Sequence, residues 1–549
     1  PAAAAGYLRR ALDEAPPDAM RRELLAELGH AEVRAGEPTA VESLSAALAE
    51  APDRERHAGV ALELGRALLV GGRLDDAVAL LAGVLDGTPA LDPDTALRLE
   101  AELITASRLD ARSRPLAARR LASIRPDLAG ARPGERLMLA HLAYEAVTLG
   151  EPAAHAATLA RRALAGGTLL AEVGSEAPTY YIAASALSLC DHLREADAAL
   201  TAAQRAAQEA GSAIGFAIAT SFRASVRVRQ GALVDAEADA RSVLDSAEHG
   251  WHPLGPAFLV DALVERGALD EAETILESIG MLGAIPENML FQPLLYARGD
   301  LRIAQGRLGE GVEDLLEGGR RAAEAGIRTP AFRDYRSSAA HGLARLGRVD
   351  EARGLAREEL ELARRFGAPR ALAIALRCAG QLEGGATGLA LLRDAADAVA
   401  GSEAVLERAR CLLELGAATR RAGRRGDACP PLREALEIAH ACGADPLAEQ
   451  ARTELAAAGS RPRRPARSGV DALTASERRV AHLATEGMTN REIAQALFVT
   501  LKTVEWHLAH AYRKLGIAGR AQLASALGGA AGSSSRASPA EAPVPTPAP

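Results

Sequence analysis

The stretch Gly347-Arg-Val-Asp-Glu-Ala352 contains the local pattern that decides the fold of most of this chain. Glycine can end one helix in the left-handed conformation, and an acidic residue near the start of the next helix suits the positive end of its dipole. The alanine that follows is small enough to let two helices approach closely. The stretch therefore predicts a tight turn between two packed helices.

The same pattern recurs along the chain. Its copies begin at Gly72, Gly231, Gly267, Gly306, Gly347 and Gly423. In the copy that begins at Gly306, Gly311 takes the place of the alanine. From Gly231 the copies are 36, 39, 41 and 76 residues apart, and the last interval is roughly two periods. A period near 38 residues with two helices in each unit predicts a stacked array of helix pairs. Between Asp110 and Gly211 only Leu193-Arg-Glu-Ala196 hints at this turn.

The repeated unit resembles the tetratricopeptide repeat. Its intervals are longer than that family's period of about 34 residues, and most of the family's Trp and Tyr positions are not matched. The resemblance implies a degenerate, tetratricopeptide-like solenoid over residues 1–458, with a long concave groove and repeats that contact only their neighbours. We expect this region to bind a small-molecule or protein effector.

Composition supports an all-α protein and limits its function. Hydrophobic residues make up 48% of the chain and aromatic residues only 3%, so the core is built from Ala, Leu and Val, which favours packed helices. The net charge of −8 argues against a protein that coats nucleic acid along its whole length, but it permits a local basic module. No apolar run approaches the roughly 18 to 20 residues that span a bilayer, and the five scattered cysteines fit a reducing cytoplasm. We expect a cytoplasmic protein with no membrane partner.

The sequence predicts no catalytic residue, no metal site and no cofactor. It lacks the Gly-x-x-x-x-Gly-Lys-(Ser/Thr) loop of nucleotide-binding proteins and the Gly-x-Ser-x-Gly turn of hydrolases. His440-Ala-Cys442 and Cys190-Asp-His192 bring two types of metal ligand close together, but neither has a companion pair. Buried cysteine in such helices is usually part of the core. The chain as given is therefore not predicted to be an enzyme.

The rare aromatic residues of the array have two interpretations. Tyr180-Tyr181, Trp251 and Phe291 stand out in a region that is otherwise poor in aromatic side chains. They fit the wall of a ligand groove, and they also fit ordinary core packing, which is the favoured interpretation.

Composition changes at residues 459–470, which we predict to be an exposed basic linker rich in Arg and Pro. Its arginines either belong to a solvated tether or follow a DNA backbone and add a salt-dependent, sequence-independent contribution to binding. These residues are Arg461, Arg463, Arg464 and Arg467. At the other end, residues 529–549 consist mainly of Gly, Ala, Ser and Pro and are predicted to be a disordered tail.

Helix starts are well marked in the domain between linker and tail, residues 471–528. Thr474-Ala-Ser-Glu477 and Thr489-Asn-Arg-Glu492 are capping boxes, and Thr500 is a third candidate N-cap. With Gly487 and Gly516 as helix ends, we predict helices over 475–486, 490–498, 501–515 and 520–527. A tight turn around Val499 joins the second helix to the third, which makes a helix-turn-helix.

The third of these helices has two different faces when its residues are placed at ~100° intervals. The side predicted to pack on the first two helices carries Val504, Leu508, Ala511 and Leu515. The opposite side carries Lys502, Trp506, Ala509, His510 and Arg513. An exposed tryptophan among cations indicates a covered surface, and the DNA major groove admits one α-helix. The alternative for Trp506 is packing against a neighbouring domain.

Many fixed spacings in this domain carry a family resemblance. They are found in Leu473-Thr-Ala-Ser-Glu477, Gly487-Met-Thr-Asn-Arg-Glu-Ile-Ala494, Thr503-Val-Glu-Trp-His507, Lys514-Leu515 and Arg520. The domain resembles the LuxR-type DNA-binding domain. The resemblance implies four helices, of which the third enters the major groove, and a homodimer joined through the fourth. One residue departs from the pattern, because the family commonly has Lys where this chain has Glu505.

The helix faces and the resemblance together give the candidate site residues. The residues predicted to contact DNA are Thr489, Asn490, Arg491, Thr500, Lys502, Thr503, Glu505, Trp506, Ala509, His510, Arg513 and Lys514. The residues predicted to form the dimer are Arg520, Leu523, Ala524 and Leu527. Thr489 can cap its helix and bind a phosphate as well. His507 lies at the edge of the core face and is predicted to be structural.

A helical-repeat region followed by this domain is similar to the C-terminal part of the large ATP-binding LuxR-type activators, which resemble the bacterial maltose activator. We therefore predict a bacterial transcription regulator that binds double-stranded DNA sequence-specifically, with RNA polymerase as a partner if it is an activator. Two alternatives stay open. One is a protein-interaction scaffold with a vestigial C-terminal domain, and the other is the C-terminal part of an ATP-dependent regulator whose P-loop domain lies upstream of Pro1.

Overall fold

The computed structural model describes residues 1–87, 91–110, 112–124, 128–245, 253–460 and 473–528. The chain forms two compact units, Pro1–Pro462 and Arg463–Pro549. The described residues are largely helical and include no β-strand, so the all-α class is confirmed. The linker arginines, Trp251 and the predicted tail lie outside the described residues. No helix of the described part is long and apolar enough to cross a membrane.

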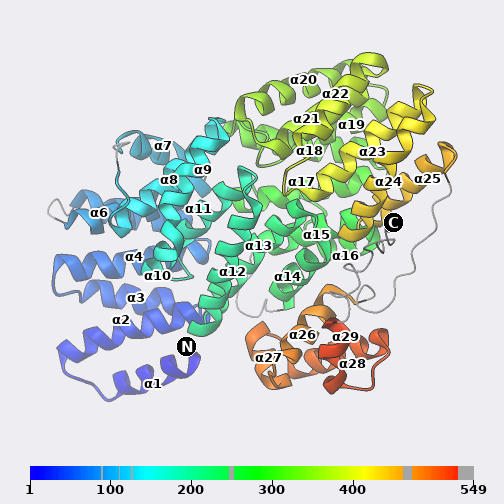
Figure 1. Ribbon diagram of the computed structural model, residues 1–549. Helices are drawn as coiled ribbons and strands as arrows, with labels where there is room; N and C mark the ends of the chain where they lie inside the picture. The colour runs from blue at the N-terminus through cyan, green and yellow to red at the C-terminus, as the bar shows by residue number, and fades with distance from the viewer. Residues whose placement is uncertain (88–90, 111, 125–127, 246–252, 461–472, 529–549) are drawn as a thin grey trace, which may run out of the picture. The chain divides into compact units, whose positions relative to one another are not determined.

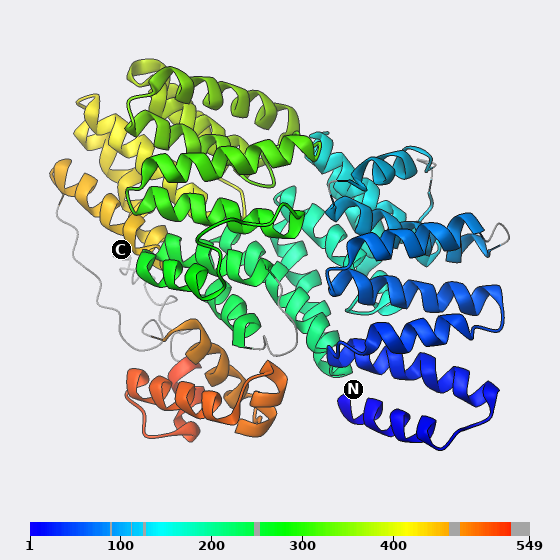
Figure 2. The same cartoon turned by 180° about the vertical axis from the view of Figure 1, so that it is seen from behind.

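The first unit is a stack of antiparallel helices, seen from two sides in Figures 1 and 2. Its first part consists of α1 (Ala2–Asp13), α2 (Asp18–Ala35), α3 (Ala40–Ala49), α4 (Arg54–Val70), α5 (Leu74–Gly87), α6 (Pro93–Leu109), α7 (Arg114–Ala122), α8 (Pro133–Leu149), α9 (Ala153–Leu164), η1 (Ala165–Gly167), α10 (Thr168–Val173), α11 (Pro178–Leu189) and α12 (Leu193–Ala210). It continues with α13 (Ala213–Gln230), α14 (Leu233–Asp245), α15 (Leu254–Arg266), α16 (Leu269–Ser278), η3 (Met289–Phe291), α17 (Gln292–Ala304), α18 (Leu308–Glu324), α19 (Tyr335–Arg345), α20 (Val349–Phe366), α21 (Pro369–Glu383), α22 (Gly385–Ala398), α23 (Val405–Arg421), α24 (Arg425–Cys442) and α25 (Asp445–Ala457).

The predicted turn is present at all six glycines, which have φ values between 72° and 84°. In each copy the next helix begins two residues later. The alanine five residues after the glycine is fully buried in every copy that has one, namely Ala77, Ala236, Ala272, Ala352 and Ala428. In the copy with Gly311, a Cβ at that position would lie 2.7 Å from the carbonyl oxygen of Gly299 and 2.6 Å from Cγ1 of Ile303. The small residue therefore marks the point at which paired helices come closest.

The copy at which Leu193-Arg-Glu-Ala196 only hinted begins at Asp191, which has φ of 65°. Helix α12 starts two residues later, and Ala196 is fully buried five residues later, as in the other copies. Aspartate is one of the few residues other than glycine that tolerate this conformation. Oδ2 of Asp191 also accepts a hydrogen bond of 2.6 Å from the backbone N–H of Arg370, at the start of α21. The turn therefore binds a helix 179 residues further along the chain.

The array doubles back on itself, which corrects the expectation that its repeats contact only their neighbours. Helix α13 packs against α2 near one end of the array and against α23 near the other, and α15 packs against α25. The glycine turns permit this approach, because a Cβ on Gly231 would lie 2.8 Å from Sγ of Cys442 and 2.9 Å from Cβ of Leu406. One buried cluster accordingly contains Ala101 and Ala404. Both ends of the array close onto α13.

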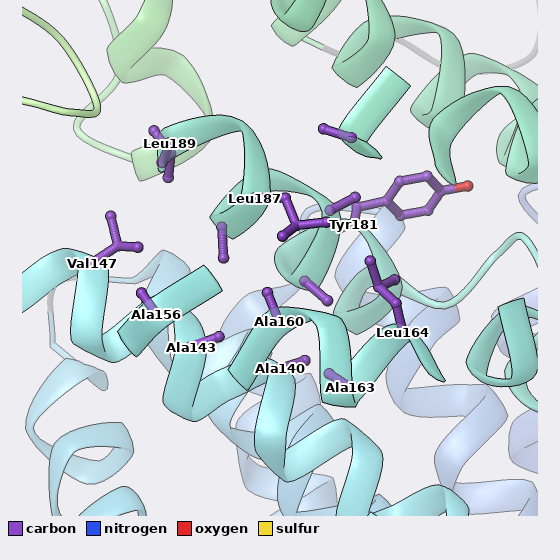
Figure 3. Close-up of a cluster of buried hydrophobic side chains, with 14 of the residues drawn as sticks. Ala140, Ala143, Val147, Ala156, Ala160, Ala163, Leu164, Tyr181, Leu187 and Leu189 are labelled. Carbon is purple, nitrogen blue, oxygen red and sulfur yellow. The ribbon is translucent and has the colours of Figure 1, made fainter. Parts of the chain in front are cut away.

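Alanine accounts for the tight packing inside the stack. Ala143 of α8 and Ala156 and Ala160 of α9 are fully buried where these two helices meet (Figure 3). Tyr181 extends from α11 away from these alanines. Small side chains thus fill the interface between α8 and α9.

Two buried ion-pair clusters recur 75 residues apart in the array. In the first, Arg223 donates two hydrogen bonds of 2.8 Å to Asp239, and Arg227 donates one of 2.9 Å. The second repeats this arrangement at 2.8 to 2.9 Å with Arg298, Arg302 and Asp314. Since 75 residues is close to two periods of the array, two units that are two periods apart have the same internal ion pairs.

The second unit is a small helical domain with a hydrophobic core of its own. Its elements are α26 (Ala475–Thr485), α27 (Asn490–Leu497), α28 (Leu501–Leu515), η5 (Arg520–Gln522) and α29 (Leu523–Gly528). The first three helices agree with the prediction to within one residue. The predicted fourth helix begins as the 3-10 turn η5 and becomes α-helical at Leu523.

Candidate functional site

The helix starts of the C-terminal domain are fixed by side-chain caps. Oγ1 of Thr489 accepts the N–H of Glu492 at 3.2 Å, and Oε2 of Glu492 accepts the N–H of Thr489 at 2.6 Å. Thr474 and Glu477 form the same reciprocal pair at the start of α26. Oγ1 of Thr500 accepts the N–H of Thr503 at 3.2 Å. The two predicted capping boxes and the third N-cap are confirmed.

The turn between α27 and α28 depends on Phe498, which has φ of 54°. This residue ends α27 in the left-handed conformation, and the N–H of Val499 then bonds to the carbonyl of Ala494 at 3.0 Å. A bulky residue in this conformation is uncommon, and it costs roughly 1 to 2 kcal/mol. The sequence pattern predicts the turn around Val499 and does not single out Phe498, because no glycine marks the position.

The core face of α28 is the one predicted from helical spacing. Val504, Leu508 and Ala511 are buried against α26 and α27, and Leu515 is half-buried. The opposite face is exposed and carries Lys502, Glu505, Trp506, Ala509 and Arg513. The side chain of Trp506 is 55% exposed, which makes it one of the large hydrophobic residues most open to solvent in the described part of the chain.

The ring of Trp506 is held in place by two histidines. Its centroid lies 4.0 Å from the ring of His510 and 5.0 Å from that of His507. Nη2 of Arg513 donates to Nδ1 of His510 at 3.1 Å, so Nδ1 acts as the acceptor in this contact. His507 and His510 are half-buried. Trp506, His510 and Arg513 therefore form one continuous outward surface.

Lys514, predicted to contact DNA, is bound inside the domain. Its Nζ lies 2.7 Å from Oε2 of Glu477, whose side chain is 2% exposed. Burial by itself raises the pKa of Glu477, but the hydrogen bonds from Lys514 and from the N–H of Thr474 outweigh it and hold that pKa below its usual value. The lysine joins α28 to α26. Its predicted role on DNA stays a prediction.

Arg520 and Leu523, predicted to form the dimer, are also engaged within the domain. Arg520 donates to Oδ1 of Asn490 and to the carbonyl of Ala484, both at 3.1 Å, and also to the carbonyl of Met488. Leu523 is fully buried in the core. Of the four residues in the predicted dimer set, Ala524 is exposed and Leu527 is half-buried.

The remaining predicted DNA contacts lie at the starts of α27 and α28. Thr489, Arg491 and Thr500 are exposed, and Asn490 and Thr503 are half-buried. The side chain of Asn490 already accepts the hydrogen bond from Arg520. The first amides of an α-helix have no partner within the helix, so these helix starts can bind a phosphate.

The array contains a cavity of about 590 Å³. Tyr181 and Phe291, two of the rare aromatic residues noted in the sequence, line it. Tyr180 is instead packed in the core, and its hydroxyl donates to the carbonyl of Ala199 at 2.9 Å. Tyr180 is thus packed in the core, whereas Tyr181 and Phe291 border a cavity, and a ligand-binding role for these two stays a prediction.

The cysteines and histidines near one another in sequence do not gather into a metal site. Within the described ranges, no group of three or more His, Cys, Asp and Glu residues is arranged to hold a metal ion. Cys190 and Cys442 are buried, and burial raises the pKa of their thiols to about 12 and about 11.

Two helices joined by a tight turn, the second with one face in the core and the other exposed, form a helix-turn-helix, a motif found in DNA-binding domains. Residues 471–527 match the family described as bacterial regulatory proteins, luxR family. The spore germination protein GerE of Bacillus subtilis is 46% identical over 50 residues, which are 9% of this chain and 68% of GerE. The chain belongs to the luxR family of bacterial regulatory proteins through this domain.

Longer relatives match this chain over a similarly short stretch. A protein named as an HTH-type transcriptional regulator in Mycobacterium bovis is 52% identical over 61 residues, and its counterpart in Mycobacterium tuberculosis strain H37Rv is 51% identical over 61 residues. The match covers 11% of this chain and 7% of each of those proteins. The chain therefore aligns with only a small part of the mycobacterial relatives.

Two solved structures are similar to a large part of the chain. The Rap protein complexed with Competence and Sporulation Factor is 14% identical, with a TM-score of 0.44, over 72% of this chain and 99% of that one. The Cut9–Hcn1 hetero-tetramer of APC/C is 13% identical, with a TM-score of 0.40, over 79% of this chain and 86% of that one. The tetratricopeptide-like character of the array is defined by its own helix pairs and glycine turns.

Proposed function

We propose that this chain is a sequence-specific, DNA-binding transcription regulator whose helix α28 enters the major groove. The observation that carries the proposal is the 55% exposure of Trp506 on a helix whose opposite face is buried in the core. An indole held rigidly on the outside of a domain is costly in water, and a groove about 12 Å wide covers it. Lys502 and Arg513 lie on the same exposed surface and supply positive charge.

The helix starts complete the proposed contact with the duplex. The exposed residues Thr489, Arg491 and Thr500 stand beside backbone amides that can donate to phosphate oxygens. These contacts fix the position of the protein on DNA without reading its sequence. Base contacts come from the middle of α28, where Glu505 can accept from a cytosine amine and Ala509 can touch a thymine methyl group.

We further propose that the regulator binds DNA as a homodimer through α29. The surface available for this purpose includes exposed Ala524 and half-buried Leu527, while Arg520 and Leu523 support that surface from within their own domain. Two copies of α28 then read an inverted repeat. In this proposal the protein acts in the bacterial cytoplasm, and it contacts RNA polymerase if it is an activator.

The array is proposed to bind an effector and to change the DNA affinity of the C-terminal domain. Its cavity has the size of a ligand pocket, since such pockets usually enclose about 300 to 1,000 Å³. An effector alters DNA binding only if it binds the two states of the protein with different affinities.

Selection of fragments from a randomised DNA pool by the full chain tests the proposal. The wild type is expected to enrich one motif with two-fold symmetry, and the double variant Trp506→Ala, Arg513→Ala is expected to lose it. A matched control, Met20→Ala with Arg421→Ala, removes an exposed apolar residue and an exposed arginine from the array and should enrich the same motif as the wild type. If the Trp506 double variant enriches the same motif, α28 does not read the DNA.

The scaffold alternative is supported by the bonds of Lys514 and Arg520 inside the domain and by the exposed carboxylate of Glu505. These features leave fewer cations for phosphates. A salt titration separates the two functions. If the protein binds several phosphates, the logarithm of its affinity for DNA falls linearly with the logarithm of the salt concentration. A scaffold would show no such dependence in the presence of duplex DNA.

A further inference from the structure

Aromatic residues gather around one cavity in the described part of the chain. The chain has seven Phe, seven Tyr and two Trp, and of the fifteen that lie in the described ranges eight form part of the wall of the 590 Å³ cavity in the array. They are Tyr144, Tyr181, Phe222, Phe258, Phe291, Tyr296, Phe332 and Tyr335. Since the interfaces between helices are filled by Ala and Leu, this gathering of large side chains around a space indicates a binding site and not core packing alone.

The cavity exists because the array doubles back. Its wall is built from helices far apart in the sequence, including α6, α8, α11, α13, α15, α17 and the segment that leads into α19. Helix α13 contributes residues from Ala213 to Arg229. A ligand in this space would therefore touch both the earlier and the later helices of the array at once.

The wall also carries charge, in the form of five arginines and two aspartates. These are Arg108, Arg229, Arg333, Arg336, Arg370, Asp261 and Asp334. Four of the arginines have a carboxylate partner that neutralises their charge. Two of these carboxylates line the cavity, and the other two are not among its lining residues. Arg333 makes two bonds of 2.9 Å to Asp261, and Arg370 lies 3.7 Å from Asp334. Glu145 pairs with Arg108 and Glu358 with Arg336.

Arg229 is the exception. No carboxylate of the described residues lies within 4.0 Å of its guanidinium, which donates through Nη2 to the carbonyls of Ala331 at 2.9 Å and Phe332 at 3.2 Å. Its Nε and Nη1 donate to no acceptor in the part of the chain that the structure describes. Burial, together with the neighbouring charge of Arg370, outweighs the nearby carboxylates of Asp191 and Asp334 and lowers the pKa of Arg229 to about 9, so the group is still cationic at neutral pH. A cation held in an apolar wall is stabilised by an anion that joins it.

We propose that the cavity binds a small carboxylic acid with an apolar body, whose carboxylate is received by Arg229. The planar guanidinium matches the two oxygens of a carboxylate, and its free nitrogens can donate to both. The aromatic wall takes the apolar body, and a single unpaired cation favours a single acidic group. This proposal deepens the sensing role proposed for the array and does not depend on DNA binding.

A ligand bound at Arg229 would act on a contact between two distant parts of the array. The guanidinium lies at the C-terminal end of α13 and holds the segment at Ala331 and Phe332, about a hundred residues further along the chain. A carboxylate bound there would join the same contact. Binding is therefore expected to stabilise the closed form of the array.

Calorimetric titration of the full chain tests the proposal with three probes: naphthalene-1-acetate and decanoate as acids, and naphthalene-1-acetamide as the uncharged match of the first. The wild type is expected to bind at least one acid, and naphthalene-1-acetate about tenfold more tightly than the amide, which is the effect of a charge-assisted hydrogen bond. Arg229→Gln should lose this preference and keep the affinity for the amide. Arg205→Gln, which changes an exposed arginine of α12, should behave as the wild type.

Two results would overturn the proposal. One is equal binding of acid and amide by the wild type, which would make the cavity a neutral apolar site, and the other is the absence of binding by all three probes. If Arg229→Gln unfolds, Arg229→Lys keeps the charge without the planar fork and should retain a weaker preference for the acid. DNA selection with the same proteins tests DNA binding by the C-terminal domain separately. Failure of acid binding in the cavity and failure of DNA binding by α28 can therefore be told apart.

Discussion

Nζ of Lys514 lies 2.7 Å from Oε2 of Glu477, so one of the two lysines of this chain holds the recognition helix against the first helix of its domain. The same carboxylate oxygen accepts the N–H of Thr474 at 2.7 Å. One buried side chain thus caps α26 and anchors α28. The orientation of the outward face of α28 depends on this anchor.

The substitution Lys514→Gln should destabilise the C-terminal domain by about 1.5 to 3 kcal/mol, because it leaves a buried carboxylate without its charged partner. Urea unfolding can be followed through Trp506 alone in a Trp251→Phe background, since the chain has only these two tryptophans. The matched control is Lys502→Gln on the exposed face of the same helix, which should change the stability by less than about 0.5 kcal/mol. Equal effects of the two substitutions would contradict the anchoring role.

The stability of this domain should also depend on pH through Glu477. Its pKa is lower in the folded state than in the unfolded chain, so the folded domain binds fewer protons. The stabilisation is therefore present above the unfolded pKa of about 4.3 and is lost as the pH falls through the lower folded value. Unfolding by urea between pH 7 and pH 3 measures it, and Glu477→Gln should flatten this part of the profile.

The substitution Lys502→Gln should weaken DNA binding by a similar factor on every DNA sequence. If this lysine neutralises one phosphate, the slope of log affinity against log salt concentration should fall by about 0.9. Fluorescence anisotropy of labelled duplex at several salt concentrations measures the slope. An unchanged slope would place Lys502 away from the DNA backbone.

Removal of the charge of the exposed Glu505 should have the opposite effect on DNA affinity. Replacing it by Gln removes a negative charge from the surface proposed to face DNA, so non-specific affinity should rise at low salt. If Glu505 also accepts from a cytosine amine, the preference for that base should relax at one position of the selected motif. Selection from a randomised pool by Glu505→Gln reads both effects, and an identical motif with identical affinity would exclude this residue from the interface.

In the array, Gly311→Ala should cost about 1 to 3 kcal/mol, because the added Cβ would overlap the carbonyl of Gly299 and the side chain of Ile303. The matched control in the same helix is Gly309→Ala, whose Cβ would meet nothing within 4 Å. It should leave the stability unchanged or raise it by up to about 1 kcal/mol. Thermal unfolding followed by circular dichroism separates the two variants.

The structural features that could be predicted from the sequence are those determined by residues at helical spacing. The glycine turns and the faces of α28 follow from residues close together in the chain, and both were predicted. Only a hint of the turn at Asp191 was visible, because aspartate stands where the other copies have glycine, and its bond to Arg370 of a distant helix follows from no local pattern. For the same reason, the bonds of Lys514 and Arg520 could not be predicted, since their partners are on other helices.

The cavity was beyond prediction for a related reason. A sequence pattern specifies which helices form a pair, but the angle between successive pairs decides whether a stack stays open or returns on itself. That angle results from many packed side chains together. The closeness of Gly231 to Leu406 is therefore visible only in three dimensions.

The packing of α13 against both α2 and α23 changes how the array would respond to force or to truncation. In an open stack each repeat contacts only its neighbours, so the stack can lengthen by small adjustments at each interface. For the same reason it tolerates the loss of a terminal unit. Here any lengthening must first separate α13 from α2, or α13 and α15 from α23 and α25. The array acts as a clamp, and displacements that begin near either of its ends reach the helix that carries Arg229.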